Sequence, residues 1–135
     1  MLGRRLAILL VAALATSGCG QDGAADTARS VTDRFMAAVE SGDGEVACAQ
    51  LSPETRGQLE EQEQRQCREA VTELRLDAGS VARVRVYALN AMVELSSGEA
   101  EFLEQGEQGW RLSAVGCEPQ AGMPADRPYD CQLED

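Results

Sequence analysis

The sequence contains no histidine and no lysine, and only five of its 135 residues are aromatic. Histidine is the only side chain whose unperturbed pKa lies near neutrality, and it is the commonest metal ligand. Its absence removes the usual general base, the serine–histidine triad and the common zinc sites. Any catalysis would therefore depend on a carboxylate with a shifted pKa, and we expect neither a metal nor another cofactor.

Arginine supplies all twelve basic side chains, against 23 acidic residues, so the formal net charge is −11. Removal of an N-terminal segment containing Arg4 and Arg5 would change this charge to −13, from 10 arginines against 23 acids. Nucleic acid and anionic headgroups would meet a like-charged surface, so we expect no nucleic-acid partner and interpret the acidity as solubility. The lysine-free, Arg-, Ala- and Gly-rich composition resembles that of proteins from high-GC bacteria such as the actinomycetes.

The first nineteen residues have the pattern of an export signal. Arg4 and Arg5 precede an apolar run of ten residues, 6–15, which small residues separate from Cys19. Ten residues rise only about 15 Å as a helix, roughly half the thickness of the hydrocarbon core of a bilayer. The pattern therefore predicts a signal peptide over residues 1–18 rather than a membrane-spanning helix.

Residues 16–19, Thr-Ser-Gly-Cys, resemble the lipobox of bacterial lipoproteins, although Thr16 stands where that family usually has leucine. In that family the cysteine becomes the lipid-bearing first residue of the mature chain. The resemblance implies a lipid on Cys19, the membrane as a partner, and anchoring at the extracytoplasmic face of the bacterial cell membrane. The alternative is ordinary secretory cleavage after Ala15, at an Ala-x-Ala site, which would release a soluble protein.

The number of cysteines favours lipidation. Five is odd, but the use of Cys19 leaves four, which can pair completely in an oxidising compartment. Four cysteines permit three pairings. We predict Cys48–Cys67 and Cys117–Cys131, because each joins neighbours in sequence and leaves no element unattached. No C-x-x-C spacing occurs, which disfavours redox chemistry and metal binding.

Helical patterns fill the first half of the mature chain. Residues 19–26 are small and polar, and we expect a flexible tether there. Apolar residues at three- and four-residue spacing predict a helix from Asp26 or Thr27 to Ser41. A short helix over residues 44–51 follows, then a third that begins at Ser52-Pro53-Glu54, and finally one that carries Cys67.

Beyond Ser80 the apolar period changes to two, which predicts a four-stranded antiparallel meander. Two-residue turns at 89–90 and 97–98 place Phe102 opposite Val93 on the apolar face. The same register places Glu101 opposite Glu94 on the face toward water. Residues 118–135 hold three of the four prolines, and we expect an irregular coil pinned by Cys131.

Three helices followed by a curved meander that ends in Gly-Trp-Arg-Leu resemble the NTF2-like α+β cone fold, particularly its small exported bacterial lipoproteins. The resemblance is carried by residues 28–42, 47–48, 51–54, 109–112 and 116–117. It implies an α+β domain over residues 27–117, with three to four helices packed on one face of the four-stranded sheet. Some members of that family are isomerases or dehydratases that use an inward Asp or an Asp/His pair, and others bind ligands or partners without catalysis.

Five residues are candidates for a pocket between the helices and the sheet, or for simple core filling, which we favour: Phe35, Met36, Phe102, Glu104 and Trp110. A small apolar ligand would suit such a pocket. The inward positions are apolar apart from Glu104, which argues against catalysis. We therefore expect a membrane-anchored binding or interaction module. The alternatives are an isomerase or dehydratase with a buried carboxylate, and a structural envelope protein that contacts neighbours through the acidic region 54–73.

Overall fold

The computed structural model describes residues 20–77, 79–121 and 128–135. In that part the helices are α1 (Gln21–Ser41), α2 (Gly44–Gln50), α3 (Pro53–Glu63), α4 (Cys67–Ala70) and the 3₁₀ helix η1 (Val71–Glu73). The strands are β1 (Val81–Tyr87), β2 (Asn90–Leu95), β3 (Ala100–Gly106), β4 (Gly109–Pro119) and β5 (Tyr129–Glu134). The predictions of a signal peptide and of a lipid on Cys19 lie outside the described residues.

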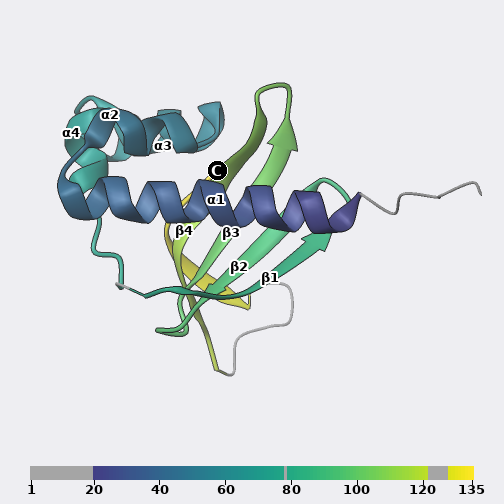
Figure 1. Cartoon of the computed structure of the whole chain (residues 1–135). Coiled ribbons are helices and arrows are strands. Elements are labelled where there is room, and N and C mark those ends of the chain that lie inside the picture. The colour runs from purple at the N-terminus through teal and green to yellow at the C-terminus, as the bar shows by residue number, and fades with distance from the viewer. Residues whose placement is uncertain (1–19, 78, 122–127) are drawn as a thin grey trace, which may run out of the picture.

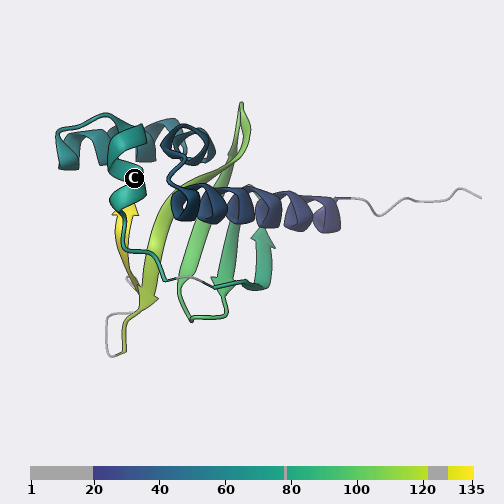
Figure 2. The same ribbon diagram turned by 60° about the vertical axis from the view of Figure 1, so that its left-hand side comes forward.

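The five strands form one open antiparallel sheet in sequence order, β1-β2-β3-β4-β5. Helix α1 lies across one face of this sheet, and α2, α3 and α4 gather near the C-terminal end of α1 (Figures 1 and 2). The α+β prediction is confirmed. The predicted number of strands is wrong, because the C-terminal segment adds a fifth.

Helix α1 begins at Gln21, so residues 21–26 belong to the helix and not to a flexible tether. Alanine is the best helix former, and Ala24 packs against the core, which explains why the helix extends past the expected cap. The helix ends at Gly42, whose φ of 75° is the left-handed conformation that glycine adopts without strain.

Two side-chain caps position the short helices. The Asp43 carboxylate accepts a hydrogen bond from the Val46 N–H, and the Ser52 hydroxyl accepts one from the Thr55 N–H. Thr55 Oγ1 in turn donates to the Ser113 carbonyl at 2.9 Å, which attaches the start of α3 to β4. The beginning of α3 is therefore fixed against the sheet.

The structure contains two disulfides, and they are the pairs that sequence neighbourhood predicts. Cys48–Cys67 joins α2 to α4, and Cys117–Cys131 joins β4 to β5. Both bonds close loops of fewer than twenty residues, 19 and 14 apart in sequence. In the chain-entropy account each contributes about 3 kcal/mol to stability.

The C-terminal segment is a strand over Tyr129–Glu134, so the predicted coil is wrong there. Leu133 pairs with Val115 and is only 1% exposed, and Cys131 pairs with Cys117. The alternation of Tyr129, Cys131 and Leu133 with polar residues is too short to stand out in the sequence. The segment is a strand because it pairs with β4.

The register of the sheet differs from the predicted one. The turn between β1 and β2 is at residues 88–89. The connection between β2 and β3 is the segment 96–98, and the Leu95 N–H donates a hydrogen bond to the Glu99 carbonyl across it. As a result Val93 faces Glu101, and Phe102 pairs with Met92. A slip of one residue exchanges the two faces of a strand, and β3 is therefore inverted relative to the prediction.

This inversion gives the sheet two apolar faces. The larger core lies between the helices and the sheet and includes Phe35, Leu103 and Leu112. A smaller cluster on the other face includes Met92, Ala100, Ala114 and Cys117, against which Phe102, Tyr129 and Cys131 pack. The rings of Phe102 and Tyr129 meet edge to face, with centroids 5.2 Å apart. The face that the sequence assigned to water is therefore partly covered near β5.

Candidate functional site

The five residues predicted for a pocket do not meet. Phe35 and Trp110 are 0% and 5% exposed and fill the main core, whereas Phe102 lies on the opposite face of the sheet. Met36 lines a small hollow beside the segment before β1, and Glu104 lines a cleft elsewhere on the surface. Phe35 and Trp110 therefore fill the core, which is the interpretation that the sequence favoured, and the register of β3 separates Phe102 from them.

Two glutamates are buried instead, and among the described residues they are the only buried acidic side chains. Glu99 immediately precedes β3 and is 3% exposed, and Glu101 within β3 is 0% exposed. The sequence placed Glu101 on the water side, opposite Glu94. In the structure it lies opposite Val93, on the side that faces the helices.

Backbone donors hold one oxygen of each carboxyl group. The Gly116 N–H donates to Glu101 Oε2 at 3.1 Å, and the Asp77 N–H donates to Glu99 Oε2 at 3.1 Å. Gly116 has a φ of 66° at an irregularity in the β3–β4 pairing, and a Cβ there would lie 2.9 Å from the Gln132 side chain. The glutamate pair thus connects the segment before β1 with the middle of β4.

Burial, together with the hydrogen bond and the negative charge of Glu99, raises the pKa of Glu101 to about 9, against the lowering effect of the Gly116 N–H. Burial also raises the pKa of Glu99, against the lowering effect of the Asp77 N–H. Glu101 therefore holds its proton at neutral pH. In the ionised form Oε1 of both residues would lack a hydrogen-bond partner, and a proton shared between the two groups supplies one.

A protonated carboxyl group beside a second carboxyl group is an arrangement that enzymes use for acid–base chemistry. Such chemistry requires a substrate within hydrogen-bond reach of the acid. Glu99 and Glu101 are almost fully enclosed, and neither lines the two surface clefts described below. In this conformation the pair therefore acts as a structural connection.

The first surface cleft lies between the start of α3 and the β3–β4 hairpin and has a volume of about 320 Å³. Its side chains include Ser52, Glu54, Glu104 and Arg111. Burial raises the pKa of Glu104, and the negative charges of Asp135 and Glu54 raise it further. The cleft is acidic with one cation on its wall, which suits a polar ligand group better than an apolar one.

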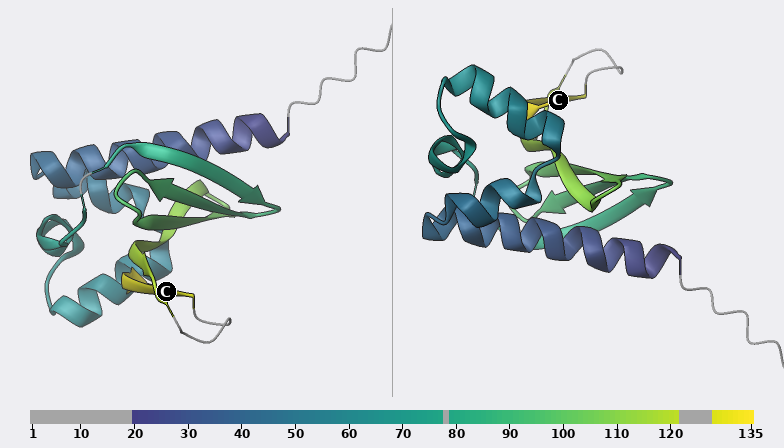
Figure 3. Two further views of the ribbon diagram at one scale, coloured as in Figure 1. Left: turned by 90° about the horizontal axis from the view of Figure 1, so that it is seen from below. Right: turned by 90° about the horizontal axis from the view of Figure 1, so that it is seen from above.

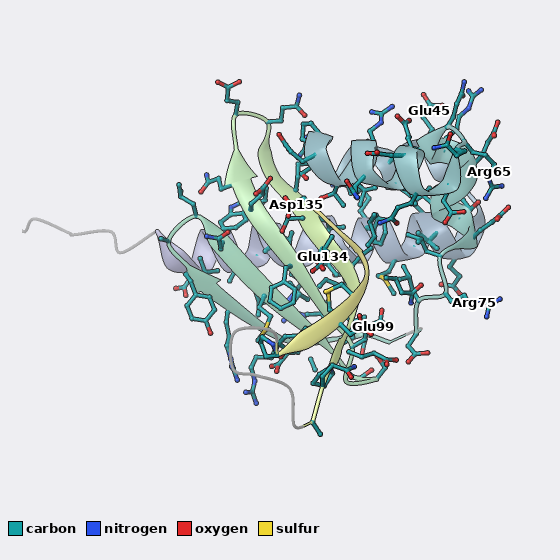
Figure 4. All side chains as sticks on the ribbon, turned by 180° about the vertical axis from the view of Figure 1, so that it is seen from behind. Glu45, Arg65, Arg75, Glu99, Glu134 and Asp135 are labelled. Atoms are coloured by element: carbon teal, nitrogen blue, oxygen red, sulfur yellow. A yellow bond between two sulfur atoms is a disulfide. The ribbon has the colours of Figure 1, made fainter. Side chains whose placement is uncertain are left out.

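The second cleft lies between α2, α3 and α4 and has a volume of about 530 Å³. It carries both signs of charge, from Arg56, Arg68 and Glu45, and its floor is the disulfide of α2 and α4. Both sulfur-bearing residues are at most 3% exposed, so the disulfide is protected from exchange. Figure 4 shows Glu45, which lines the second cleft, well apart from Glu99 of the buried pair.

Sequence reasoning missed Glu99 altogether and placed Glu101 on the wrong face. Both errors come from the length of the β2–β3 connection. A two-residue turn was predicted, whereas the structure has three residues, and this difference turns Glu99 and Glu101 toward the helices. Within residues 20–77, 79–121 and 128–135, no three potential ligand side chains converge on a metal site. No helix in the same ranges has both the length and the hydrophobicity needed to cross a bilayer.

Comparisons with protein-family models, curated proteins and solved structures found no match to this chain.

Proposed function

We propose that this protein is a lipid-anchored, extracytoplasmic interaction module of a bacterial cell envelope, and that it has no catalytic activity of its own. The lipid is carried by Cys19, and the domain that follows contacts a partner through its surface rather than through an internal ligand cavity. An envelope protein is the partner class that fits this location.

The pairing of the cysteines is the observation that carries the proposal. Cys48, Cys67, Cys117 and Cys131 are all consumed in disulfides, which persist in oxidising compartments and are rare in the cytosol. The only other cysteine in the sequence is Cys19, at the end of the export pattern. A free thiol in an oxidising compartment can form unwanted disulfides, and acylation of Cys19 would remove that thiol.

The filled interior supports a surface role. Phe35, Leu103 and Leu112 are at most 1% exposed and occupy the space between helices and sheet where a ligand of an NTF2-like cone would sit. The two clefts described above carry charged side chains and are open at the surface. Such surfaces suit contact with another protein or a polar group.

Kinship with the NTF2-like family is part of the same proposal. A long first helix that lies across a sequentially ordered antiparallel sheet supports it. The fifth strand and the bond between β4 and β5 would then be an addition of this chain. An experimental structure in which the sheet curls around α1 as a cone would support the kinship, and a flat sheet would count against it.

A carboxylate-dependent isomerase or dehydratase is the second candidate, because one observation favours it. Glu101 is a buried carboxyl group with a raised pKa beside Glu99, which is what such an enzyme requires. The activity would need the segment at Asp77 to open, since this segment covers Glu99. Turnover of a carbonyl acid that is lost in Glu101→Gln would establish this candidate over the first.

The proposed anchoring predicts the mass of the mature protein. In an actinobacterial host the full chain is expected to yield a protein that begins at Cys19 and carries a diacylglyceryl group, with no free thiol before reduction and four after it. Cys19→Ala should lose the lipid and leave the membrane fraction. Intact-mass spectrometry with and without reductant measures both features. A chain that begins at Thr16 without lipid would contradict the proposal.

A further inference from the structure

The turn between β1 and β2 exposes apolar side chains. Three large hydrophobic residues are exposed in the described part, and two of them lie here: Tyr87, just before the turn, is 57% exposed and Leu89, within it, is 60% exposed. Tight turns usually consist of Gly, Asn, Asp, Pro or Ser. Here the exposed Ala88 between them has a φ of 53°, a conformation that costs energy for any residue with a Cβ. The residues of this turn are therefore not those that turn geometry alone would favour.

The turn lies at the same end of the molecule as the start of α1. Met36 and Val39 share a hollow with the segment before β1, and Arg29 Nη1 donates to the Val81 carbonyl at 3.3 Å, so β1 runs toward the N-terminus of α1. From Val81 the strand advances about 20 Å to its last residue, and α1 extends about 12 Å beyond Arg29. Figures 1 and 3 show the β1–β2 turn beside the beginning of α1.

A lipid at Cys19 would hold this end of the domain at the bilayer. Only Gly20 separates Cys19 from α1, which begins at Gln21. Two residues of extended chain reach about 7 Å, so the domain cannot move far from the headgroups. A turn at the same end of the domain is then within reach of the interface.

We propose that the β1–β2 turn is a second membrane contact, in which Tyr87 and Leu89 enter the interfacial layer of the bilayer that holds the lipid on Cys19. This inference depends on the proposed anchoring. Tyrosine has an apolar ring and a polar hydroxyl and favours the headgroup level, and leucine favours the acyl boundary just below it.

The charges around the turn fit a zwitterionic interface. Arg83 and Arg85 on β1 lie 3.5 and 3.9 Å from the Glu94 carboxylate, so this part of the surface carries no unbalanced negative charge. Asp22 and Asp26 at the start of α1 disfavour an anionic surface. Two apolar side chains cannot retain a protein on a bilayer when even one acyl chain binds only reversibly. The lipid therefore supplies the attachment, and the turn fixes the orientation, with α2, α3 and α4 directed away from the membrane.

Site-specific fluorescence on the acylated, full-length mature protein tests this contact. Leu89→Cys is labelled with an environment-sensitive fluorophore and reconstituted in phosphatidylcholine vesicles, with and without lipids that carry a nitroxide near the headgroup. The matched control is Glu61→Cys, an exposed position on α3, and this helix lies with α2 and α4 near the C-terminal end of α1, away from the β1–β2 turn (Figure 1). Tyr87→Cys is the second variant, so that the result does not depend on one labelled position.

The fluorophores at positions 87 and 89 are expected to shift to shorter emission wavelengths in vesicles and to lose intensity with the nitroxide lipids, while that at 61 does neither. Emission at 87 and 89 that matches the control would overturn the membrane contact. Acylation is measured by intact mass on the same sample. An acylated protein with a water-exposed turn refutes this inference alone, whereas an unacylated one refutes the proposed anchoring and the inference with it.

Discussion

Replacement of Glu101 with glutamine is expected to remove most of the pH dependence of stability between about pH 5 and pH 9. Glutamine has the shape of the protonated glutamate, and its oxygen can still accept the Gly116 N–H. Its amide can donate toward Glu99, as the carboxyl proton does in the wild type. Because glutamine does not titrate, the variant loses only the ionisation that the buried site resists.

The sign follows from proton binding. Folded Glu101 keeps its proton up to pH about 9, whereas in the unfolded chain the group releases it near its ordinary value of 4.5. Between these values the folded state binds more protons, so the free energy of unfolding falls as the pH rises. The stability that the protonated Glu101 contributes is fully present below pH 4.5 and is lost by about pH 9. From about pH 5.5 to 7.5 the wild type should lose about 3 kcal/mol of unfolding free energy.

Urea unfolding of the mature protein at a series of pH values, with disulfides intact, measures this effect. Glu101→Gln should have a nearly flat stability profile, with a smaller slope remaining because the pKa of Glu99 is also raised. It should exceed the wild type in stability at pH 8. The control Glu61→Gln changes an exposed glutamate and should keep the wild-type slope. A wild-type slope in Glu101→Gln would mean that Glu101 is already ionised at neutral pH.

The helices could be predicted because local chemistry determines them. Ser52 caps α3 at the point where the sequence predicts a helix to begin, Asp43 caps α2, and Gly42 follows the last residue of α1. Each of these signals acts within four residues of its target, so it needs no knowledge of the rest of the chain. The start of α1 was missed because alanine propensity and the packing of Ala24 extend it without a cap.

The buried glutamates could not be predicted because they depend on register. One extra residue in the β2–β3 connection moves Glu101 from the face toward water to the face toward the helices. The sequence gives no reason to bury an acid among apolar neighbours. The stabilising features are the Gly116 and Asp77 N–H groups, which come from segments 15 and 22 residues away.

The fifth strand was missed for a related reason. Its alternating side chains are few, and three prolines nearby favour coil. Pro128 lies just before the strand and Pro119 ends β4, so neither removes a hydrogen bond from the middle of the ladder. The bond of Cys117 with Cys131, which the sequence did predict, joins residues directly paired across the two strands.

Gly44→Ala is expected to destabilise the protein by about 3 kcal/mol, at the upper end of the usual cost of overpacking. Gly44 is the first residue of α2, and a Cβ there would overlap the carbonyl oxygen of Arg68 in α4. The obstacle is backbone, so no side-chain rotation relieves it. The disulfide of Cys48 with Cys67 holds the same two helices together and prevents them from separating.

Gly57→Ala is the matched control, because it makes the same change within α3, where no atom outside the local helix backbone lies within 4 Å of the added Cβ. Alanine favours the helix interior over glycine by up to about 1 kcal/mol, so this variant should gain stability. The two substitutions should therefore shift the urea midpoint in opposite directions. Equal effects on the urea midpoint would mean that α2 and α4 lie far enough apart to leave room for a Cβ at position 44.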